Sequence, residues 1–239
     1  MTRSSAPSSV ISKSLNGLPN PGFPRGVDLR VEAQRSRRRL YPVTMLYSVY
    51  SLGVLLAALL SGHSVAAVVA FFLAGIAAWT CLEYLAHRYI LHGRFPDGEG
   101  LLRHFLHQRF DHLHYEHHQR PWDGNHINGT ISDTLPVVAV LALASFLAPL
   151  HTLPVLVAGM LQAYIGEEWV HHSVHFYNFR GRYFRYIRRH HLYHHSPQGS
   201  EVGFGLTNGI WDVLSHTRIP PAARALLYGS PSPGGPPTA

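Results

Sequence analysis

Uncharged apolar runs alternate with polar stretches along this chain. The first run extends from Pro42 to Leu60, and the second from Val65 to Leu85 with its first charge at Glu83. About 20 apolar residues in a helix cover roughly 30 Å, the thickness of the hydrocarbon layer of a bilayer. The two runs therefore predict two transmembrane helices, with Pro42 in the first helical turn. The short polar break at residues 61–64 indicates an antiparallel pair.

A second pair of apolar runs follows further along the chain. It covers Leu135–Leu150, breaks at residues 151–154 and resumes through Ile165. These runs are shorter, so a hairpin that enters only part of the bilayer is the alternative to two full spans. The whole pattern predicts an all-α integral membrane protein with about four transmembrane helices in two antiparallel pairs.

The polar stretches set the expected domain limits. Residues 1–24 are rich in Ser, Pro and Gly, which predicts a flexible segment without a cleaved signal peptide. Residues 25–40 are basic, and we expect a short helix there on the membrane surface. The predicted organisation is a flexible, basic arm over 1–40, a membrane domain over 41–218 and a tail over 219–239 that is disordered at its end.

The net charge of +7 comes from cations that flank apolar runs, as Arg35–Arg39 do. Nucleic acid binding would also favour basic residues, but juxtamembrane cations explain this placement better. The Arg- and aromatic-rich stretch 180–189 is likewise interpreted as an interfacial anchor, so no nucleic acid partner is expected. Positive residues face the cytosol. We therefore expect the N-terminus and, after two membrane pairs, the histidine-rich segments on the cytosolic side.

Histidine is the residue type that indicates chemistry. The chain has nineteen, and seventeen of them lie between His87 and His195. Four groups stand out: His87 and His92; His114, His117 and His118; His171 and His175; His191, His194 and His195. Spacings of three and four place side chains on one helical face, close enough to share a metal ion. Imidazole suits Fe, Zn and Cu. Because Cys81 is the single cysteine, the sequence excludes an intramolecular disulfide, a Cys-type zinc finger and an iron–sulfur cluster.

A single histidine pair is more often a helix-end or interfacial feature than a metal site. Four groups beside membrane segments, two of them with the same H-x2-HH pattern, favour metal binding. The histidines are internal and not repetitive, which is unlike a tag or a low-complexity metal buffer.

The order of these motifs resembles the fatty acid hydroxylase and sterol desaturase superfamily over about residues 40–218. The resemblance is carried by Glu83-Tyr84-Leu85-Ala86-His87-Arg88 with His92, by His114-x2-His117-His118 with Pro121 and Asp123, by His171-x3-His175 and by His191-x2-His194-His195. Gly203-Phe204-Gly205, Trp211-Asp212 and Thr217 are similar to the segment that closes fatty acid 2-hydroxylases. The sequence departs from those enzymes after Asp123, at residues 124–127.

The resemblance implies a dimetal centre in a cytosolic, His-rich helical cap above four membrane helices. The implied ligands are His87, His92, His114, His117, His118, His171, His175, His191, His194 and His195. The implied metal is two iron ions, which zinc can replace in a purified sample, with O2 as co-substrate. His104, His107, His112, His172 and His190 fall outside the motifs. We also expect Glu83, Glu167 and Glu168 to accept hydrogen bonds from ligand rings.

The implied function is that of an oxidoreductase, a diiron oxygenase that hydroxylates or desaturates a lipid C–H bond. The expected substrate is fatty acyl or sterol-like. Few residues precede the first apolar run, so we expect electrons from a separate cytochrome b5-like or ferredoxin-like protein.

Two alternatives stay open at this stage. A carotenoid hydroxylase of the same superfamily also resembles residues 86–93 and 188–195. A non-enzymatic membrane protein for metal binding or transport would instead place polar ligands at mid-membrane depth.

Overall fold

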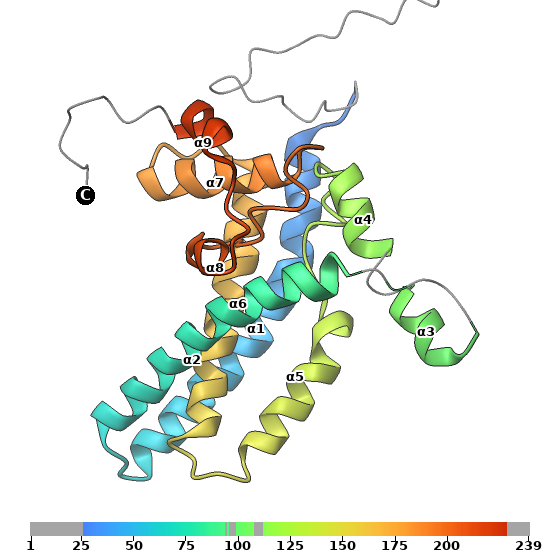
Figure 1. The fold of residues 1–239 in the computed structure, drawn as a ribbon. Coiled ribbons are helices and arrows are strands. Elements are labelled where there is room, and N and C mark those ends of the chain that lie inside the picture. Colours follow the sequence, from blue (N-terminus) through green and yellow to red (C-terminus); the bar gives the residue numbers. More distant parts are fainter. Residues whose placement is uncertain (1–25, 94, 96–98, 108–111, 229–239) are drawn as a thin grey trace, which may run out of the picture.

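The computed structural model describes residues 26–93, 95, 99–107 and 112–228, and these residues form helices and loops without strands. A bundle is made by α1 (Leu29–Leu60), α2 (Val65–Leu85), α5 (Ile131–Ser145) and α6 (Leu153–Phe176). A cap is made by a π-helix (Ala86–Leu91), α3 (Leu101–Leu106), α4 (His112–Gln119), α7 (Arg182–His194), α8 (Ile210–Leu214) and α9 (Pro221–Tyr228). Figure 1 shows the cap at one end of the bundle and the helix-connecting turns at the other, with α3 projecting sideways. The predicted all-α architecture is confirmed.

Helix α1 begins well before the first apolar run. Asp28 caps its N-terminus by accepting a hydrogen bond from the Arg30 amide at 2.8 Å. Pro42 lies inside the helix, so the predicted start at this residue is wrong. The basic stretch that was expected as a separate surface helix forms the first turns of α1, where Ser36 and Leu40 are buried. Residues 1–25 of the predicted arm lie outside the described residues.

Helix α6 contains both the last apolar run and the H-x3-H pair. Pro154 stands in its first turn, where a missing N–H costs nothing. The helix then continues past Ile165 to Phe176, so the apolar run and the H-x3-H pair belong to the same element. In the predicted tail, α9 forms a helix that the sequence did not indicate. The Arg189 side chain donates to the Leu227 carbonyl at 2.8 Å and attaches α9 to α7. Residues 229–239 lie outside the described residues.

Helix α6 packs against both α1 and α2. At the α2–α6 crossing the two backbones touch through glycines. A Cβ on Gly75 would lie 2.0 Å from the Leu156 carbonyl oxygen, and one on Gly159 would lie 2.1 Å from the Phe72 oxygen. Small residues allow this close approach between helices, as is common in membrane bundles. The α2–α6 spacing is therefore set by backbone contact.

The bundle presents an apolar exterior. The segments Leu29–Leu60 and Val65–Leu91 are long and apolar enough to cross a membrane, and only 28% and 11% of their apolar windows are buried. A core helix of a soluble protein would be mostly buried. No charged residue occurs between Tyr41 and Leu82 or between Thr134 and Gly166. The protein therefore associates with membranes. Helix α5 has 15 residues, about 22 Å, so four full spans stay a prediction.

The glycine contact predicts a position-specific effect on stability. Gly159→Ala should lower the free energy of unfolding by about 1–3 kcal/mol, because the added methyl group overlaps the α2 backbone. The matched control is Gly166→Ala on the same helix, where a Cβ meets nothing within 4 Å. This substitution should be neutral or stabilise by up to about 1 kcal/mol through helix propensity. Thermal and denaturant unfolding in detergent would measure both, and equal effects would contradict the proposed packing.

Candidate metal centre

The ten histidines implied by the sequence resemblance all meet at the cap end of the bundle. They form two groups of five in which the candidate ligand nitrogens lie within 4.8 Å of one another. Group A contains His87, His92, His114, His118 and His194, and group B contains His117, His171, His175, His191 and His195. The two groups adjoin each other, because the His118 and His195 rings stack at 4.2 Å. The structure thus places all ten at one double site.

The two H-x2-HH motifs are shared between the groups. In α4 the outer histidines, His114 and His118, belong to group A, while His117 belongs to group B. In α7 the outer histidines belong to group B, and the middle one, His194, belongs to group A. Residues i and i+4 lie on one helical face and i+3 lies beside it. Each helix therefore contributes to both sites, which gives the centre an approximate twofold pattern.

The H-x4-H pair requires a special helix. A separation of five residues turns by about 500° in an α-helix of 3.6 residues per turn, which points the two side chains apart. Residues Ala86–Leu91 form a π-helix instead, and the His92 amide donates to the His87 carbonyl at 3.0 Å. This wider turn brings both rings into group A. π-Helical turns often occur at functional sites.

The nitrogen spacing fits a metal ion with several imidazole ligands. Neighbouring Nε2 atoms are 2.9–3.2 Å apart in both groups, for example 2.9 Å between His114 and His92 and 2.9 Å between His191 and His175. A metal–nitrogen bond of about 2.1 Å separates two ligands at right angles by about 3.0 Å. The donor set contains only imidazoles, which suits iron, zinc or copper.

Burial keeps these rings neutral. It lowers the pKa of His118 to about 3 and that of His92 to about 4. Burial, with a further contribution from nearby imidazoles, also lowers the pKa of His117, His191 and His195 well below the usual value. A neutral imidazole keeps a lone pair on one nitrogen, which is the form that binds a metal. The site is therefore in its ligand form at neutral pH.

Backbone carbonyls orient two of the group A rings. His87 Nδ1 donates to the Phe204 carbonyl at 2.5 Å, and His194 Nδ1 donates to the Val202 carbonyl at 2.8 Å. Since a carbonyl can only accept, both rings carry their proton on Nδ1 and direct the Nε2 lone pair into the group. Such partners fix the tautomer and the ring angle of a metal ligand.

The expectation that three glutamates would play this part is wrong. Glu83 accepts from the Leu206 and Thr207 amides at 2.6 and 2.7 Å, and from the Thr207 hydroxyl at 2.6 Å. Glu167 accepts from Trp79 Nε1 at 2.7 Å, and Glu168 accepts from Asn128 Nδ2 at 2.6 Å. Each carboxylate thus satisfies a donor on another segment, and it is backbone oxygens that bond to His87 and His194.

The segment that presents these carbonyls is held by two buried carboxylates. Besides the Glu83 contacts, Asp212 accepts from the Phe204 amide at 2.9 Å and from the Gly205 amide at 3.0 Å. Gly203 has φ of +70°, and a Cβ on Gly205 would lie 1.8 Å from the Asn208 oxygen. Only glycine fits both positions. The Gly-Phe-Gly motif and the Asp in the closing segment therefore shape this turn.

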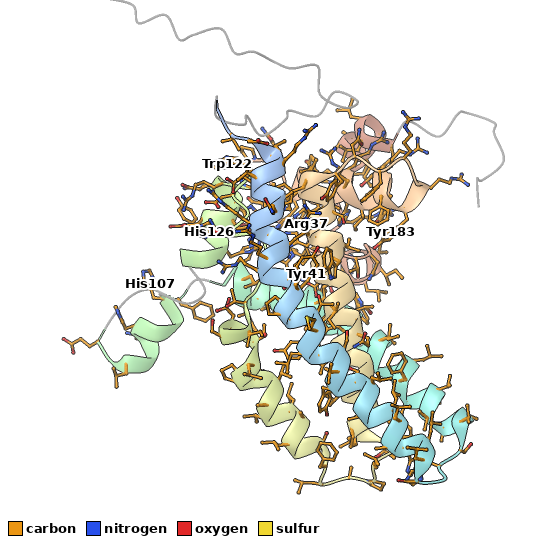
Figure 2. All side chains as sticks on the ribbon, turned by 180° about the vertical axis from the view of Figure 1, so that it is seen from behind. Arg37, Tyr41, His107, Trp122, His126 and Tyr183 are labelled. Atoms are coloured by element: carbon orange, nitrogen blue, oxygen red, sulfur yellow. The ribbon has the colours of Figure 1, made fainter. Side chains whose placement is uncertain are left out.

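Among the histidines outside the motifs, those with described side chains do not join the two groups. His107 Nδ1 donates to the Phe95 carbonyl at 2.9 Å, and Figure 2 shows His107 on α3 away from the body of the cap. His172 Nδ1 lies 2.8 Å from the Ser36 hydroxyl, and His190 Nε2 lies 3.2 Å from Asp212. His104 is exposed. The side chain of His112 lies outside the described residues.

The segment after Asp123, where the sequence departs from the 2-hydroxylase pattern, attaches the cap to α1. The Gly124 amide donates to Glu32 at 3.0 Å, and a Cβ on Gly124 would lie 2.0 Å from the Glu32 carbonyl oxygen. Figure 2 shows His126 at the cap end of the molecule, where the first turns of α1 lie. The first turns of α1 therefore support the cap, a role that the expected flexible arm did not include.

Comparisons with known proteins agree with this geometry. The chain is 29% identical to fatty acid 2-hydroxylase of Rattus norvegicus over 162 residues, which are 65% of this chain and 41% of that protein. It is 28% identical to a dihydroceramide fatty acyl 2-hydroxylase of Arabidopsis thaliana, covering 60% of this chain and 58% of the relative. A solved structure of full-length Scs7p, in which only the hydroxylase domain is visible, has the same fold with a TM-score of 0.63, 22% identity, and coverage of 76% of this chain and 67% of that one.

The chain thus spans about two fifths of the length of the rat relative. The family model described as fatty acid hydroxylase matches residues 71–217, more than half of the 239-residue chain. That stretch contains most of α2, all of α6 and both histidine groups. The chain belongs to the fatty acid hydroxylase family.

Proposed function

We propose that this protein is a membrane-bound, O2-dependent diiron oxygenase that hydroxylates or desaturates a C–H bond of a fatty acyl or sterol-like lipid. The observation that carries the proposal is the pair of five-histidine groups at the end of an apolar bundle. Relatives named as fatty acid and dihydroceramide fatty acyl 2-hydroxylases favour the fatty acyl substrate.

The ten histidines would hold two iron ions, one in each group. When bound, the irons supply O2 activation, which requires two electrons from a donor protein such as a cytochrome b5-like or ferredoxin-like partner. In hydroxylation, one oxygen atom enters the lipid C–H bond and the other leaves as water with two protons. In desaturation, two neighbouring carbons each lose a hydrogen and both oxygen atoms leave as water. The protein contributes neutral, oriented imidazoles, seven of which are buried.

An apolar cavity supports a lipid substrate. It has a volume of about 230 Å³ and lies between α2, α5 and α6, with Val137 and Leu141 on one wall and Met160 on another. Tyr164 is the cavity-lining residue of α6 that lies nearest to the cap along the helix. It precedes His171 by seven residues, which corresponds to about 10 Å along the helix. The cavity therefore lies in the membrane half directly below the histidines, where the distal part of an acyl chain would lie.

Trp79 marks the boundary between this cavity and the cap. Its ring lines the cavity and contacts the Tyr164 ring at 5.2 Å, while its Nε1 donates to Glu167. The next turn of α6 carries His171. We propose that a chain from the bilayer passes this tryptophan, so that its reacting carbon lies at the histidines.

We further propose a cytosolic position for the cap. Arg35, Arg37, Arg38 and Arg39 lie in the cap half of α1, and both histidine groups lie at that same end. Positive residues beside a membrane helix favour the cytosolic side.

The two alternatives fit less well. A transporter would need polar ligands at mid-membrane depth. Residues 41–82 and 134–166, which are uncharged, contain two histidines, His63 and His151, and both lie in turns between helices. For a carotenoid hydroxylase, the relatives would be expected to act on pigments, and the compared proteins are named for fatty acyl substrates.

The first prediction tests the reaction. Cells that produce the protein should contain lipids that have gained one oxygen or lost two hydrogens, as measured by mass spectrometry against cells with His194→Ala. The variant removes a group A ligand and should lose the product entirely. Product in the His194→Ala strain as well as in the wild-type strain would contradict the proposal. The absence of product in both strains would also contradict it, provided that the wild-type protein carries two iron ions per chain.

The second prediction tests the partition of the ligands. The wild-type protein should bind two metal ions per chain, and His171→Ala/His175→Ala should bind one, because only group B loses ligands. Metal analysis of the detergent-purified proteins would measure this. Two ions in the double variant would contradict the assignment.

The third prediction tests the cavity. Val137→Trp should fill it and shift the products towards shorter acyl chains. Val140→Trp is the matched control, because Val140 lies on the same helix with similar exposure, 67% against 62%, but does not line the cavity. Identical chain-length profiles in the two variants would show that the cavity does not hold the substrate.

A further inference from the structure

We propose that Glu83 and Asp212 are positioning residues that act on group A alone and make it the tighter of the two metal sites. This inference rests on the metal centre of the proposed function. It follows from a difference between groups A and B, which share one arrangement of histidines but differ in the hydrogen-bond partners of their Nδ1 atoms.

The two groups are matched in their ligands. Each combines a pair from a long-helix segment, the outer histidines of one H-x2-HH motif and the middle histidine of the other. His194 in group A therefore corresponds to His117 in group B. A symmetric environment would give these two rings equivalent partners.

Their environments differ. His194 Nδ1 donates to the Val202 carbonyl, and His87 in the same group donates to the Phe204 carbonyl. In group B, Nδ1 of His117, His191 and His195 is buried and has no hydrogen-bond partner within the described part of the chain. A ligand ring whose second nitrogen is bonded is held in the right tautomer and angle, and loss of such a partner typically weakens metal binding about 10- to 100-fold.

The two carbonyls are placed by the buried carboxylates. Glu83 accepts hydrogen bonds from the Leu206 and Thr207 amides, and Asp212 accepts hydrogen bonds from the Phe204 and Gly205 amides. The two carboxylates therefore fix both flanks of the turn. Asp212 also accepts from the Thr217 hydroxyl at 2.8 Å, lies 3.2 Å from Nε2 of His190, which is not a member of either group, and is fully buried. The Gly205 amide, which bonds to Asp212, shares a peptide unit with the Phe204 oxygen. The Gly203 amide, which shares a peptide unit with the Val202 oxygen, donates to the Thr217 carbonyl at 2.9 Å. Asp212 thus holds the Phe204 oxygen directly and the Val202 oxygen through Thr217, and among the described contacts no group B ring bonds to either oxygen.

The test uses Zn2+ as the probe and isolates each site. His171→Ala/His175→Ala leaves group A complete, and His87→Ala/His92→Ala leaves group B complete. Asp212→Asn is added to each, since an amide nitrogen at this position cannot accept a backbone N–H. We expect it to weaken Zn2+ binding about 10- to 100-fold in the first background and to leave it unchanged in the second, as measured by competition with a chromophoric chelator.

Two further variants separate positioning from folding. Thr207→Val removes one bond to Glu83 and should weaken group A alone, by a smaller factor. Glu168→Gln changes a carboxylate that bonds Asn128 and should leave both affinities unchanged. The unfolding temperature without metal is measured for every variant. If Asp212→Asn does not fold, the Zn2+ affinities of the Thr207→Val variant decide between a positioning role and a purely structural one. Equal weakening of both groups, or none, overturns this inference. Failure of both backgrounds to bind Zn2+ would instead overturn the metal centre.

Discussion

The backbone contact between α2 and α6 is the constraint on which the centre depends. Gly75 and Gly159 let the two helices approach until main-chain atoms touch. Each helix then leads to a histidine pair about three to five turns beyond the glycine contact. These pairs are His87 and His92 after α2, and His171 and His175 in α6. A rigid spacing here fixes the distance between the two halves of the site, because α4 and α7 add their ligands around these pairs.

The centre places many equal groups in an unfavourable arrangement. Ten neutral imidazoles face each other with Nε2 atoms 2.9–3.2 Å apart, and most of the rings are buried. Lone pairs at this distance repel, and buried polar atoms without partners cost free energy. A cation between them would convert this repulsion into coordination, so metal binding and the stability of the cap are coupled. The carbonyls of Val202 and Phe204 show how the fold limits the freedom of two rings in advance.

The boundary between the apolar half and the cap gives the site its chemical character. Below it the helices have long uncharged stretches, and the cavity lies between α2, α5 and α6 with Asp133 as the one acidic residue of its described lining. The other charged residues and the histidine groups lie towards the cap. Trp79 and Glu167 meet at this boundary. An apolar chain and the polar histidine centre can therefore adjoin without placing charges in the membrane.

The sequence by itself determined the helical class, the apolar stretches and the ten histidines that meet, because hydrophobic period and motif spacing are local properties of a chain. It did not give the start of α1 at Leu29, because the helix extends beyond the apolar run to a buried turn in which Ser36 bonds to Asn128 and His172. Nor did it give the division of the ligands. Whether His117 faces one metal site or the other depends on how α4 and α7 are rotated against each other, and whether His87 and His92 converge depends on a π-turn. The tertiary structure decided the division of the ligands, the convergence of His87 and His92, and the two backbone carbonyls that orient group A. Contacts between segments far apart in the chain produce no recognisable spacing pattern in the sequence.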